Sequence, residues 1–329
     1  MSFFRNYEYL YPDLILSIFD YFKVSTGAKD KNILSFCLKY QKEKGLKELI
    51  QPDVVFKICN ILVDNGYLTC LKSGGTMGGG SNYICVGDIS NKIINQEFYF
   101  NALVYGFEYI YNIYKENNIV IPIVTKNEKG DISVGSAFRA FGGIVTAKHC
   151  IIDGNNLSIK GYSKEDLESF EILFHENDNL DLAFIKTDRK EDNTMLLSYA
   201  DVTEDVLVMG YPKIPAFTEF LTAEKATISS KAESRLTITK GSVASYGNNY
   251  LSKAELMLVT AKIRGGNSGG PIVNKKGSIV GVACQIPSFE GDYDDLGYGI
   301  AVPINYVKEI LDGKSKKYNP SCNFFDDYI

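Results

Sequence analysis

Residues 264–271 read Arg264-Gly265-Gly266-Asn267-Ser268-Gly269-Gly270-Pro271, a run of glycines that holds a single hydroxyl side chain between two apolar segments. Glycine tolerates positive φ and lets a backbone approach a ligand closely. The amides of Gly266 and Ser268 can therefore point together at a carbonyl oxygen beside the Ser268 hydroxyl. A plain Gly-rich turn between strands is the alternative, because such turns are common. A site requires that the chain also supply a base and an orienting carboxylate.

The search for a base is short, because the chain contains only two histidines. His149 ends an apolar segment that begins at Gly143, and a strand end presents its side chain to a cleft. His175 lies among polar loop residues, which predicts a surface imidazole. His149 is therefore the candidate base. Taken alone, it could equally be a half-buried structural histidine, since imidazole packs in many interiors.

A carboxylate candidate precedes the apolar segment Leu182 to Ile185. A buried aspartate is costly without a partner, so Asp181 is expected to pair. By accepting the second N–H of the histidine, it would fix the imidazole tautomer and stabilise the imidazolium. Asp178 is the nearby rival, but it lies farther from the apolar run and is expected to be solvated.

Three segments carry a family resemblance: Thr146-Ala147-Lys148-His149-Cys150, Asp181-Leu182-Ala183 and Gly266-Asn267-Ser268-Gly269-Gly270-Pro271. In this order they resemble chymotrypsin-fold (trypsin-like) serine proteases. The resemblance covers Ile119 to Leu311 and implies an all-β domain of two six-stranded barrels. The cleft would lie between the barrels, with the histidine and aspartate on the first barrel and the serine on the second.

The same resemblance implies the role of each site residue. Ser268 would be the nucleophile, His149 the general base and then acid, and Asp181 the orienting carboxylate. The amides of Gly266 and Ser268 would form the oxyanion hole. No metal ion or organic cofactor is needed for this chemistry.

Two departures from the digestive enzymes point to one branch of the family. Asn267 stands where those enzymes carry an aspartate that binds a newly cleaved N-terminus. Cys150 follows the histidine, but no cysteine lies on the strand ahead as a disulfide partner. Both features are more similar to the bacterial HtrA (Deg) branch. That branch usually carries a PDZ domain, whereas this chain ends soon after Leu311, so we expect none and instead expect control by residues 1–118.

The resemblance also places a specificity pocket on the second barrel. Its positions are Lys262, Ile263, Cys284, Gln285, Ile286, Gly299 and Ala301. No acid falls on the pocket floor, which favours cleavage after a small or medium apolar residue over cleavage after Arg or Lys. A one-residue slip in the alignment would reverse which side chains face inward.

The composition limits the class of protein and its compartment. The 329 residues carry a formal net charge of -5 and 45% hydrophobic residues, which argues against a protein that mainly coats nucleic acid or an anionic membrane. Seven cysteines without a C-x-x-C pair fit neither a disulfide framework nor a usual zinc site. We see no signal peptide and no transmembrane stretch. These features predict a cytoplasmic protein.

Helical periodicity dominates the first part of the chain, residues 1–94. Helices are expected at 13–23, 33–44 and 52–65, followed by a hairpin at 67–72 and 83–86. This layout resembles a winged helix-turn-helix domain. The third helix, however, offers Lys57 against Asp53 and Asp64. This charge favours a protein partner or self-association through residues 1–118 over binding to nucleic acid. For the Gly-rich tip at 73–82 we expect a flexible wing tip, not a phosphate cradle.

The remaining chain divides into three parts. Aromatic residues at helical spacing predict a connecting helix at 95–118. Many short β-type segments at regular spacing predict a protease domain of two barrels at 119–312, closed by a helix at 304–311. The tail, 313–329, is expected to be a poorly ordered end.

The sequence thus predicts a serine endopeptidase that acts on protein or peptide substrates, gated by its N-terminal module through a partner or through self-association. The alternative is a DNA- or protein-binding regulator in which the barrel domain is latent or a pseudoprotease scaffold.

Overall fold

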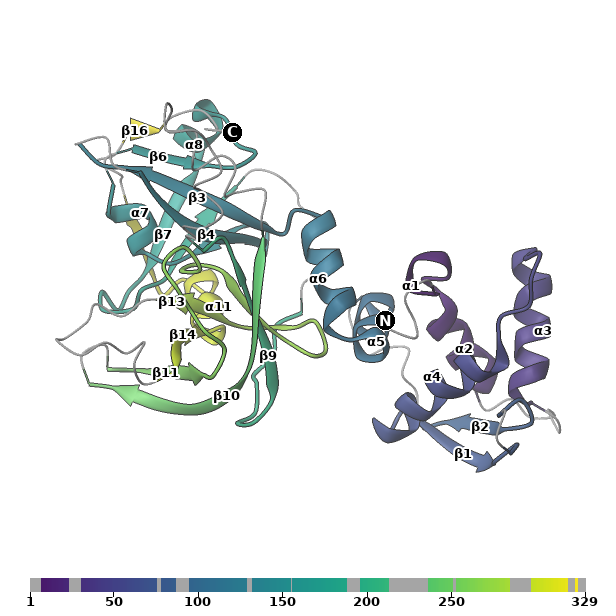
Figure 1. Ribbon diagram of the computed structural model, residues 1–329. Helices are drawn as coiled ribbons and strands as arrows, with labels where there is room; N and C mark the ends of the chain where they lie inside the picture. Colours follow the sequence, from purple (N-terminus) through teal and green to yellow (C-terminus); the bar gives the residue numbers. More distant parts are fainter. Residues whose placement is uncertain are drawn as a thin grey trace. The chain divides into compact units, whose positions relative to one another are not determined.

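The structure is a computed structural model of the chain (Figure 1). It describes residues 7–23, 31–75, 78–86, 95–128, 132–154, 156–187, 196–212, 236–250, 253–284, 297–318 and 323–324. The chain forms two compact units, residues 1–109 and 110–329.

The first unit is built from short amphipathic helices and one hairpin. Its elements are α1 (Tyr7–Leu10), α2 (Leu14–Phe22), α3 (Ile33–Lys44), α4 (Pro52–Asp64), β1 (Leu68–Lys72), β2 (Asn82–Cys85) and α5 (Gln96–Tyr105). Capping residues fix the helix ends. The Asn32 side chain accepts a hydrogen bond from the Ser35 amide at the start of α3, and Gly45 ends α3 with φ 64°. The expected helix and hairpin positions therefore agree with the structure to within two residues, and α1 was not predicted.

The Gly-rich segment between β1 and β2 is packed against the start of α3. The Leu34 amide donates to the Gly79 carbonyl (2.9 Å) and the Ile33 amide to the Ser81 carbonyl (3.1 Å). The first amides of a helix have no acceptor within the helix, and these loop carbonyls supply one. Ser81 is fully buried and accepts from the Gly74 amide. The expectation of a flexible wing tip is wrong for the described residues of this segment, because they cap a helix.

The predicted connecting helix is divided in two at Gly106. Here φ is 76°, a value that a residue with a side chain rarely adopts, and α6 (Phe107–Glu116) begins just beyond it. The expectation of a single helix is wrong, because the helical spacing of aromatic residues continues on both sides of Gly106 and does not reveal the break there. The aromatic residues of α5 belong to the core of the first unit, where the Phe100 ring lies 4.5 Å from the ring of Phe19 and 5.2 Å from that of Tyr67.

The second half of α6 belongs to the second unit. Tyr114 is fully buried, and its hydroxyl donates to the Gly277 carbonyl at 3.2 Å. Gly277 lies in the turn between β12 and β13 of the second barrel. The anchor of α6 is therefore one short strand away from the stretch that contains Ser268.

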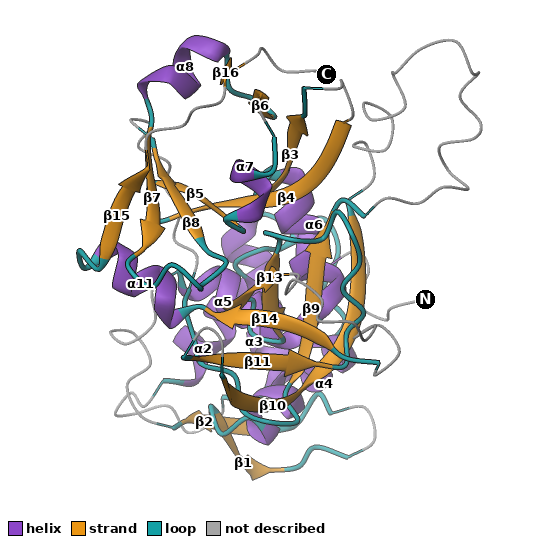
Figure 2. Cartoon of the chain, turned by 90° about the vertical axis from the view of Figure 1, so that its left-hand side faces the viewer, coloured by secondary structure: helices purple, strands orange, loops and turns teal. Residues whose placement is uncertain are grey.

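The second barrel is closed, with the strand order β10-β11-β14-β13-β12-β9 (Figure 2). Its strands are β9 (Asp205–Gly210), β10 (Thr237–Asn249), β11 (Ala254–Val259), β12 (Pro271–Asn274), β13 (Ile279–Cys284) and β14 (Gly299–Pro303). All neighbours pair antiparallel, for example Val273 opposite Leu207 and Ala283 opposite Ala301. The closed six-stranded barrel predicted for this half is confirmed.

The first half of the second unit is an open, curled sheet of eight strands, in the order β15-β7-β8-β5-β4-β3-β6-β16. Its six central strands are β3 (Val120–Lys126), β4 (Ile132–Ala140), β5 (Gly143–Thr146), β6 (Asn156–Ile159), β7 (Glu171–His175) and β8 (Ala183–Lys186). Among the described residues β6 and β7 do not pair with each other, so the predicted closed barrel is wrong here. Helices α7 (His149–Ile152), α8 (Lys164–Ser169) and α11 (Asn305–Leu311) complete the unit.

Each open edge of this sheet is covered by a strand of the C-terminal tail. β15 (Ser315–Tyr318) pairs antiparallel with β7, and β16 (Asn323–Phe324) pairs parallel with β6. Phe174 and Tyr318 stack at 4.4 Å between ring centroids. An unpaired strand edge leaves backbone groups without partners, and the tail supplies them. The expectation of a poorly ordered end is therefore wrong for 315–318 and 323–324.

We find no helix in the described parts of the chain with the length and apolar character needed to span a membrane.

Candidate active site

The three candidate residues come from three different places in the second unit, residues 110–329. His149 is the first residue of α7, directly after β5, and Asp181 lies two residues before β8. Ser268 lies in the connection between β11 and β12. Strands β5 and β8 are hydrogen-bonded neighbours, so the ends that carry the histidine and the aspartate meet at one edge of the sheet.

Asp181 holds His149 through two hydrogen bonds. The carboxylate oxygen Oδ2 lies 2.7 Å from Nδ1 of the imidazole, and Oδ1 accepts the backbone N–H of His149 at 2.9 Å. Both side chains are partly buried, with 28% of the histidine and 19% of the aspartate exposed. This double contact fixes the ring orientation and makes Nδ1–H the favoured tautomer, which directs Nε2 away from the carboxylate.

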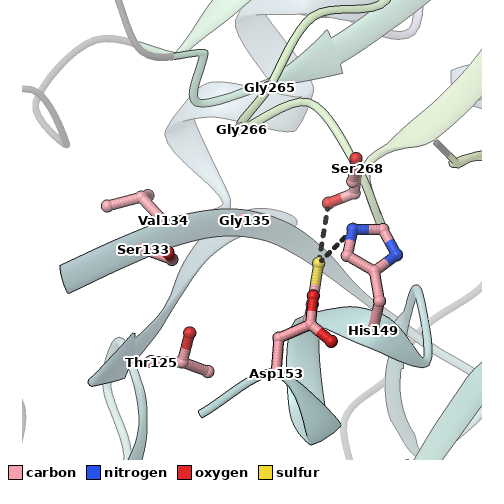
Figure 3. A pocket seen from close by; sticks show the side chains of 10 residues that line it. Thr125, Ser133, Val134, Gly135, His149, Asp153, Gly265, Gly266 and Ser268 are labelled. Carbon is pink, nitrogen blue, oxygen red and sulfur yellow. Dashed lines mark hydrogen bonds between the residues drawn. The ribbon is translucent and has the colours of Figure 1, made fainter. Parts of the chain in front are cut away.

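The thiol of Cys150 lies between His149 and the Ser268 segment. Its sulfur is 3.7 Å from His149 Nε2 and donates to the Ser268 carbonyl at 3.4 Å (Figure 3). Within the described residues, no hydrogen bond joins the Ser268 hydroxyl to the imidazole. The structure thus brings together the histidine and the aspartate, and it places Ser268 in the same pocket without the final contact.

Gly135 makes room for this thiol. A Cβ at position 135 would stand 2.6 Å from Cys150 Sγ, closer than any side chain tolerates. The strand opposite Cys150 therefore carries a residue without a side chain at the point where the sulfur packs.

The neighbours of His149 shift its pKa upward. Burial alone would lower the pKa, but the hydrogen bond to Asp181 and the contact with Cys150 outweigh it and raise the pKa above the ordinary 6.5. The protonated imidazole is therefore favoured in this arrangement. A base must first lose that proton before it can accept one from serine.

The Gly-rich stretch leaves two amides without acceptors among the described residues. Gly266 adopts φ 98°, and the Asn267 amide turns back to the Arg264 carbonyl at 2.9 Å. The amides of Gly266 and Ser268, on either side of Asn267, donate to no described group. Ser268 itself is 3% exposed. These are the two amides that the sequence proposed as oxyanion donors.

A buried serine that the sequence did not single out ties the open sheet to this stretch. Ser136, in β4, donates its backbone N–H to the Ser268 carbonyl (2.8 Å) and its hydroxyl to the Gly266 carbonyl (2.6 Å). Its hydroxyl also accepts the Tyr211 amide at 2.9 Å, and its carbonyl accepts the Thr146 hydroxyl at 2.7 Å. No sequence signal marks this residue, because its partners lie 10 to 132 positions away.

Gly269 is the glycine that this contact requires. It has φ 85°, and a Cβ there would lie 2.0 Å from the Ser136 carbonyl oxygen and 2.3 Å from Thr146 Oγ1. No L-residue with a side chain fits without moving the two halves apart. The glycine that follows Ser268 therefore serves close packing between the halves as well as backbone freedom.

The structure brings only some of the proposed specificity positions close to one another. Ile263 lies on Gly299, where a Cβ would be 2.6 Å from the isoleucine side chain, and Ala301 is part of the barrel core. Lys262 is exposed. Gln285 and Ile286 lie outside the described residues.

Cys284, one of those positions, is influenced by the charge of Asp181. It is buried, and its pKa is raised well above the usual value by burial and by the negative charge of Asp181. The neutral thiol is therefore favoured, and its sulfur donates to the Ile300 carbonyl at 3.5 Å. The sequence proposed Cys284 as a specificity position and did not indicate that the charge of Asp181 acts on it.

The sequence predicted a surface position for the second histidine, and this prediction is wrong. His175 is 5% exposed, its Nε2 lies 3.3 Å from Glu309 of α11, and its Nδ1 accepts the Asn177 amide. The apolar residues of β7 draw it inward, and it joins the open sheet to the C-terminal helix. Asp178, the rival carboxylate, is 72% exposed and pairs with Lys316. The prediction that it is solvated is therefore confirmed.

Within the described ranges, no group of three His, Cys, Asp or Glu side chains is placed to hold a metal ion.

Replacing Ser136 by alanine tests its contacts to the nucleophile segment. The variant leaves the buried Gly266 carbonyl and Tyr211 amide without their partner, so we expect a loss of about 1–3 kcal/mol in the free energy of unfolding. Denaturant unfolding measures it. Ser245→Ala, at an exposed site on β10, is the matched control and should be nearly neutral. Equal stability of both variants would contradict the assigned role.

The raised pKa of His149 predicts the pH dependence of Ser268 reactivity. The neutral imidazole is the active base, so the rate of Ser268 modification by a fluorophosphonate should rise with pH, with its midpoint above 6.5. Cys150→Ala removes one of the groups that raise the pKa and should move the midpoint to lower pH. A midpoint at or below 6.5 in the parent, or no shift in the variant, would contradict this assignment.

Comparisons with known proteins agree with this geometry. Residues 135–282 match the trypsin-like peptidase domain family. A probable periplasmic serine endoprotease DegP-like of Ectopseudomonas mendocina (strain ymp) is 28% identical over 185 residues, which cover 54% of this chain and 34% of the relative. The magnetosome formation protease MamE of Magnetospirillum gryphiswaldense is 28% identical over 185 residues, covering 54% of this chain and 22% of that protein.

Among solved structures, the active form of the Rv3671c protease from M. tuberculosis aligns with a TM-score of 0.45 and 16% identity, covering 65% of this chain and 89% of that one. The matched region spans about a third of the length of the curated DegP-like relatives. Residues 135–282 of this chain therefore form a trypsin-like serine peptidase domain, with relatives among the HtrA/DegP-like serine endoproteases.

Proposed function

We propose that this chain is a serine endopeptidase that hydrolyses peptide bonds through an acyl-enzyme on Ser268. The observation that carries the proposal is the pair of hydrogen bonds that Asp181 accepts from His149, whose side chain lines the same pocket as Ser268. A histidine held in one tautomer beside a serine in a glycine-rich stretch is the arrangement that nucleophilic catalysis requires. Protein or peptide substrates follow from this reaction.

In the proposed reaction the Ser268 oxygen attacks the substrate carbonyl while His149 Nε2 takes the serine proton. The Gly266 and Ser268 amides stabilise the negative charge that develops on the carbonyl oxygen. The C–N bond then breaks, and His149 gives its proton to the departing amine. Water, activated by the same imidazole, releases the acyl group and restores the serine.

The first step requires one rearrangement, because Nε2 faces the Cys150 thiol in this structure. The Ser268 hydroxyl has to replace the sulfur as the neighbour of Nε2. The two groups already border the same pocket, so a small rotation of side chains is the movement that we propose.

A fluorophosphonate probe tests the nucleophile. The full chain should be labelled on Ser268, and Ser268→Ala should abolish the labelling because it removes the hydroxyl that His149 would activate. Ser245→Ala, an exposed serine on β10, is the matched control and should label as the parent does. Equal labelling of the parent and Ser268→Ala would overturn the assignment. Failure of the folded parent to label at neutral and alkaline pH would favour the alternative of a pseudoprotease scaffold.

We further propose that the N-terminal unit gates this activity as a winged-helix-like module. The order of three helices followed by a hairpin in residues 14–85 supports that resemblance. On α4, Lys57 is accompanied by Asp53 and Asp64, a charge that suits a protein partner or self-association better than DNA. The buried anchor of α6 on the β12–β13 turn offers a physical route from this module to Ser268.

A truncation tests the gating. Peptide cleavage by the full chain is compared with cleavage by residues 107–329, which keep α6 and its Tyr114 anchor. If the module restrains the site, the fragment should cleave the peptide at least severalfold faster than the full chain does. If the restraint is purely intramolecular, adding residues 1–106 as a separate protein at low concentration should not slow the fragment. Equal rates for two folded proteins would contradict intramolecular restraint. Duplex DNA that changes the rate of the full chain alone would favour the nucleic-acid alternative.

The proposed compartment is the cytoplasm. Cys37, Cys59, Cys70, Cys85, Cys150 and Cys284 are free thiols, and Gly135 stands opposite Cys150. The relatives named above as periplasmic share limited identity with this chain. Cell fractionation of the tagged protein tests this localisation.

A further inference from the structure

A pocket of about 250 Å³ borders the site on the side of the open sheet. It has room for roughly eight waters, enough for one long side chain. Thr125 and Ser133, which face each other on β3 and β4, form one wall, and Gly265 and Gly266 form another. His149, Cys150 and Ser268 close it toward the reacting groups (Figure 3).

This pocket is separate from the specificity positions that the sequence resemblance places on the second barrel. None of the described specificity positions on the second barrel, Lys262, Ile263, Cys284, Gly299 and Ala301, lines it. The family resemblance of the sequence implies that those positions hold the residue that stays on the acyl-enzyme. The pocket instead extends from His149 along α7 and the open sheet, so a peptide that crosses Ser268 enters it with the residue after the cleaved bond.

The pocket contains one carboxylate that the proposed mechanism does not use. Asp153, at the end of α7, lines it, and no Lys or Arg is among its lining residues. The Asp153 carboxylate forms no hydrogen bond or ion pair with any described side chain. The charge of His149 is balanced by Asp181 on its other side. The net charge presented to an occupant is therefore negative.

Two contacts hold Asp153 in this position. Its backbone amide donates to the His149 carbonyl at 3.1 Å, which ties it to the same short helix as the catalytic candidate. The next residue, Gly154, packs so closely on β3 that a Cβ would lie 2.6 Å from the Thr125 Cβ. The carboxylate is thus carried by a backbone that is fixed relative to both His149 and Thr125.

We infer that Asp153 is a specificity-determining residue that selects a lysine or arginine directly after the cleaved bond. The long apolar stem would pass Val134 and Gly135, and the cationic group would reach Asp153 with the Thr125 and Ser133 hydroxyls beside it. This preference rests on the proposed endopeptidase function and adds a basic residue on the leaving side to an apolar residue on the acyl side.

Matched peptides test the preference. Peptides that differ only in the residue after the cleaved bond, lysine or glutamine, are compared by kcat/KM with the full chain. The lysine peptide should be favoured about threefold to fivefold at low ionic strength, and less in high salt. Asp153→Asn should bring the ratio near one, and Asp153→Lys should invert it. Asp201→Asn, which removes one exposed charge that does not line this pocket, should keep the parental ratio.

Binding supplies a readout that does not need turnover. In the full-length Ser268→Ala variant, a fluorescent peptide spanning the cleaved bond should bind more tightly with lysine than with glutamine, and Asp153→Asn should remove the difference. A parental ratio that persists in Asp153→Asn, in cleavage or in binding, would overturn the inference while leaving the peptidase intact. Absent fluorophosphonate labelling would instead count against the proposed function.

Discussion

The contact on which this site depends is the one that Ser136 makes across the two halves of the protease unit. Its backbone amide and its hydroxyl bond the carbonyls of Ser268 and Gly266, so the open sheet holds the nucleophile segment at both ends of the Asn267 turn. Gly269 permits this contact because any side chain would collide with the Ser136 carbonyl. The candidate base lies on one half and the candidate nucleophile on the other. Their relative position is therefore decided at a buried serine that takes no part in the proposed chemistry.

The state of the histidine adds a second constraint. Asp181 and Cys150 both favour the protonated ring, and the thiol occupies the neighbourhood of Nε2 that the serine hydroxyl must enter. The hydrogen bonds between His149 and Asp181 are therefore already formed, whereas the described residues show no hydrogen bond between the Ser268 hydroxyl and His149. Proteases gated by another module would use such a state, since a small rearrangement then separates the resting site from the reactive one.

The tail and α6 show how the ends of the protease unit support it. The tail strands pair with both free edges of the curled sheet, and Tyr114 of α6 is buried on the β12–β13 turn of the barrel. Strand β12 begins three residues after Ser268. Displacement of α6 would therefore reach the nucleophile segment through a short and fully buried strand. This connection is the physical basis for the proposed control by the N-terminal unit.

The sequence by itself determined the chemistry-bearing residues and the class of each half. The chain has only two histidines, one of which ends an apolar segment, and one aspartate directly precedes an apolar run. Few combinations of base and carboxylate could therefore accompany Ser268. Helix caps such as Asn32 and Gly45 are local signals, and the first-unit helices were accordingly predicted well. The break between α5 and α6 at Gly106 was not predicted, because the helical spacing of the aromatic residues does not show that one glycine adopts a positive φ.

Only the tertiary structure decided what the glycines approach and which groups face His149. Ser136 and Gly269 meet across more than 130 positions of chain, and Cys150, expected only as an unpaired thiol, lies against the imidazole nitrogen that the sequence reserved for serine. His175 turned inward to Glu309, and the tail became strands because the curled sheet left edges to pair. Long-range hydrogen bonds and close packing leave no periodic pattern in a sequence, so these contacts could be found only in the folded chain.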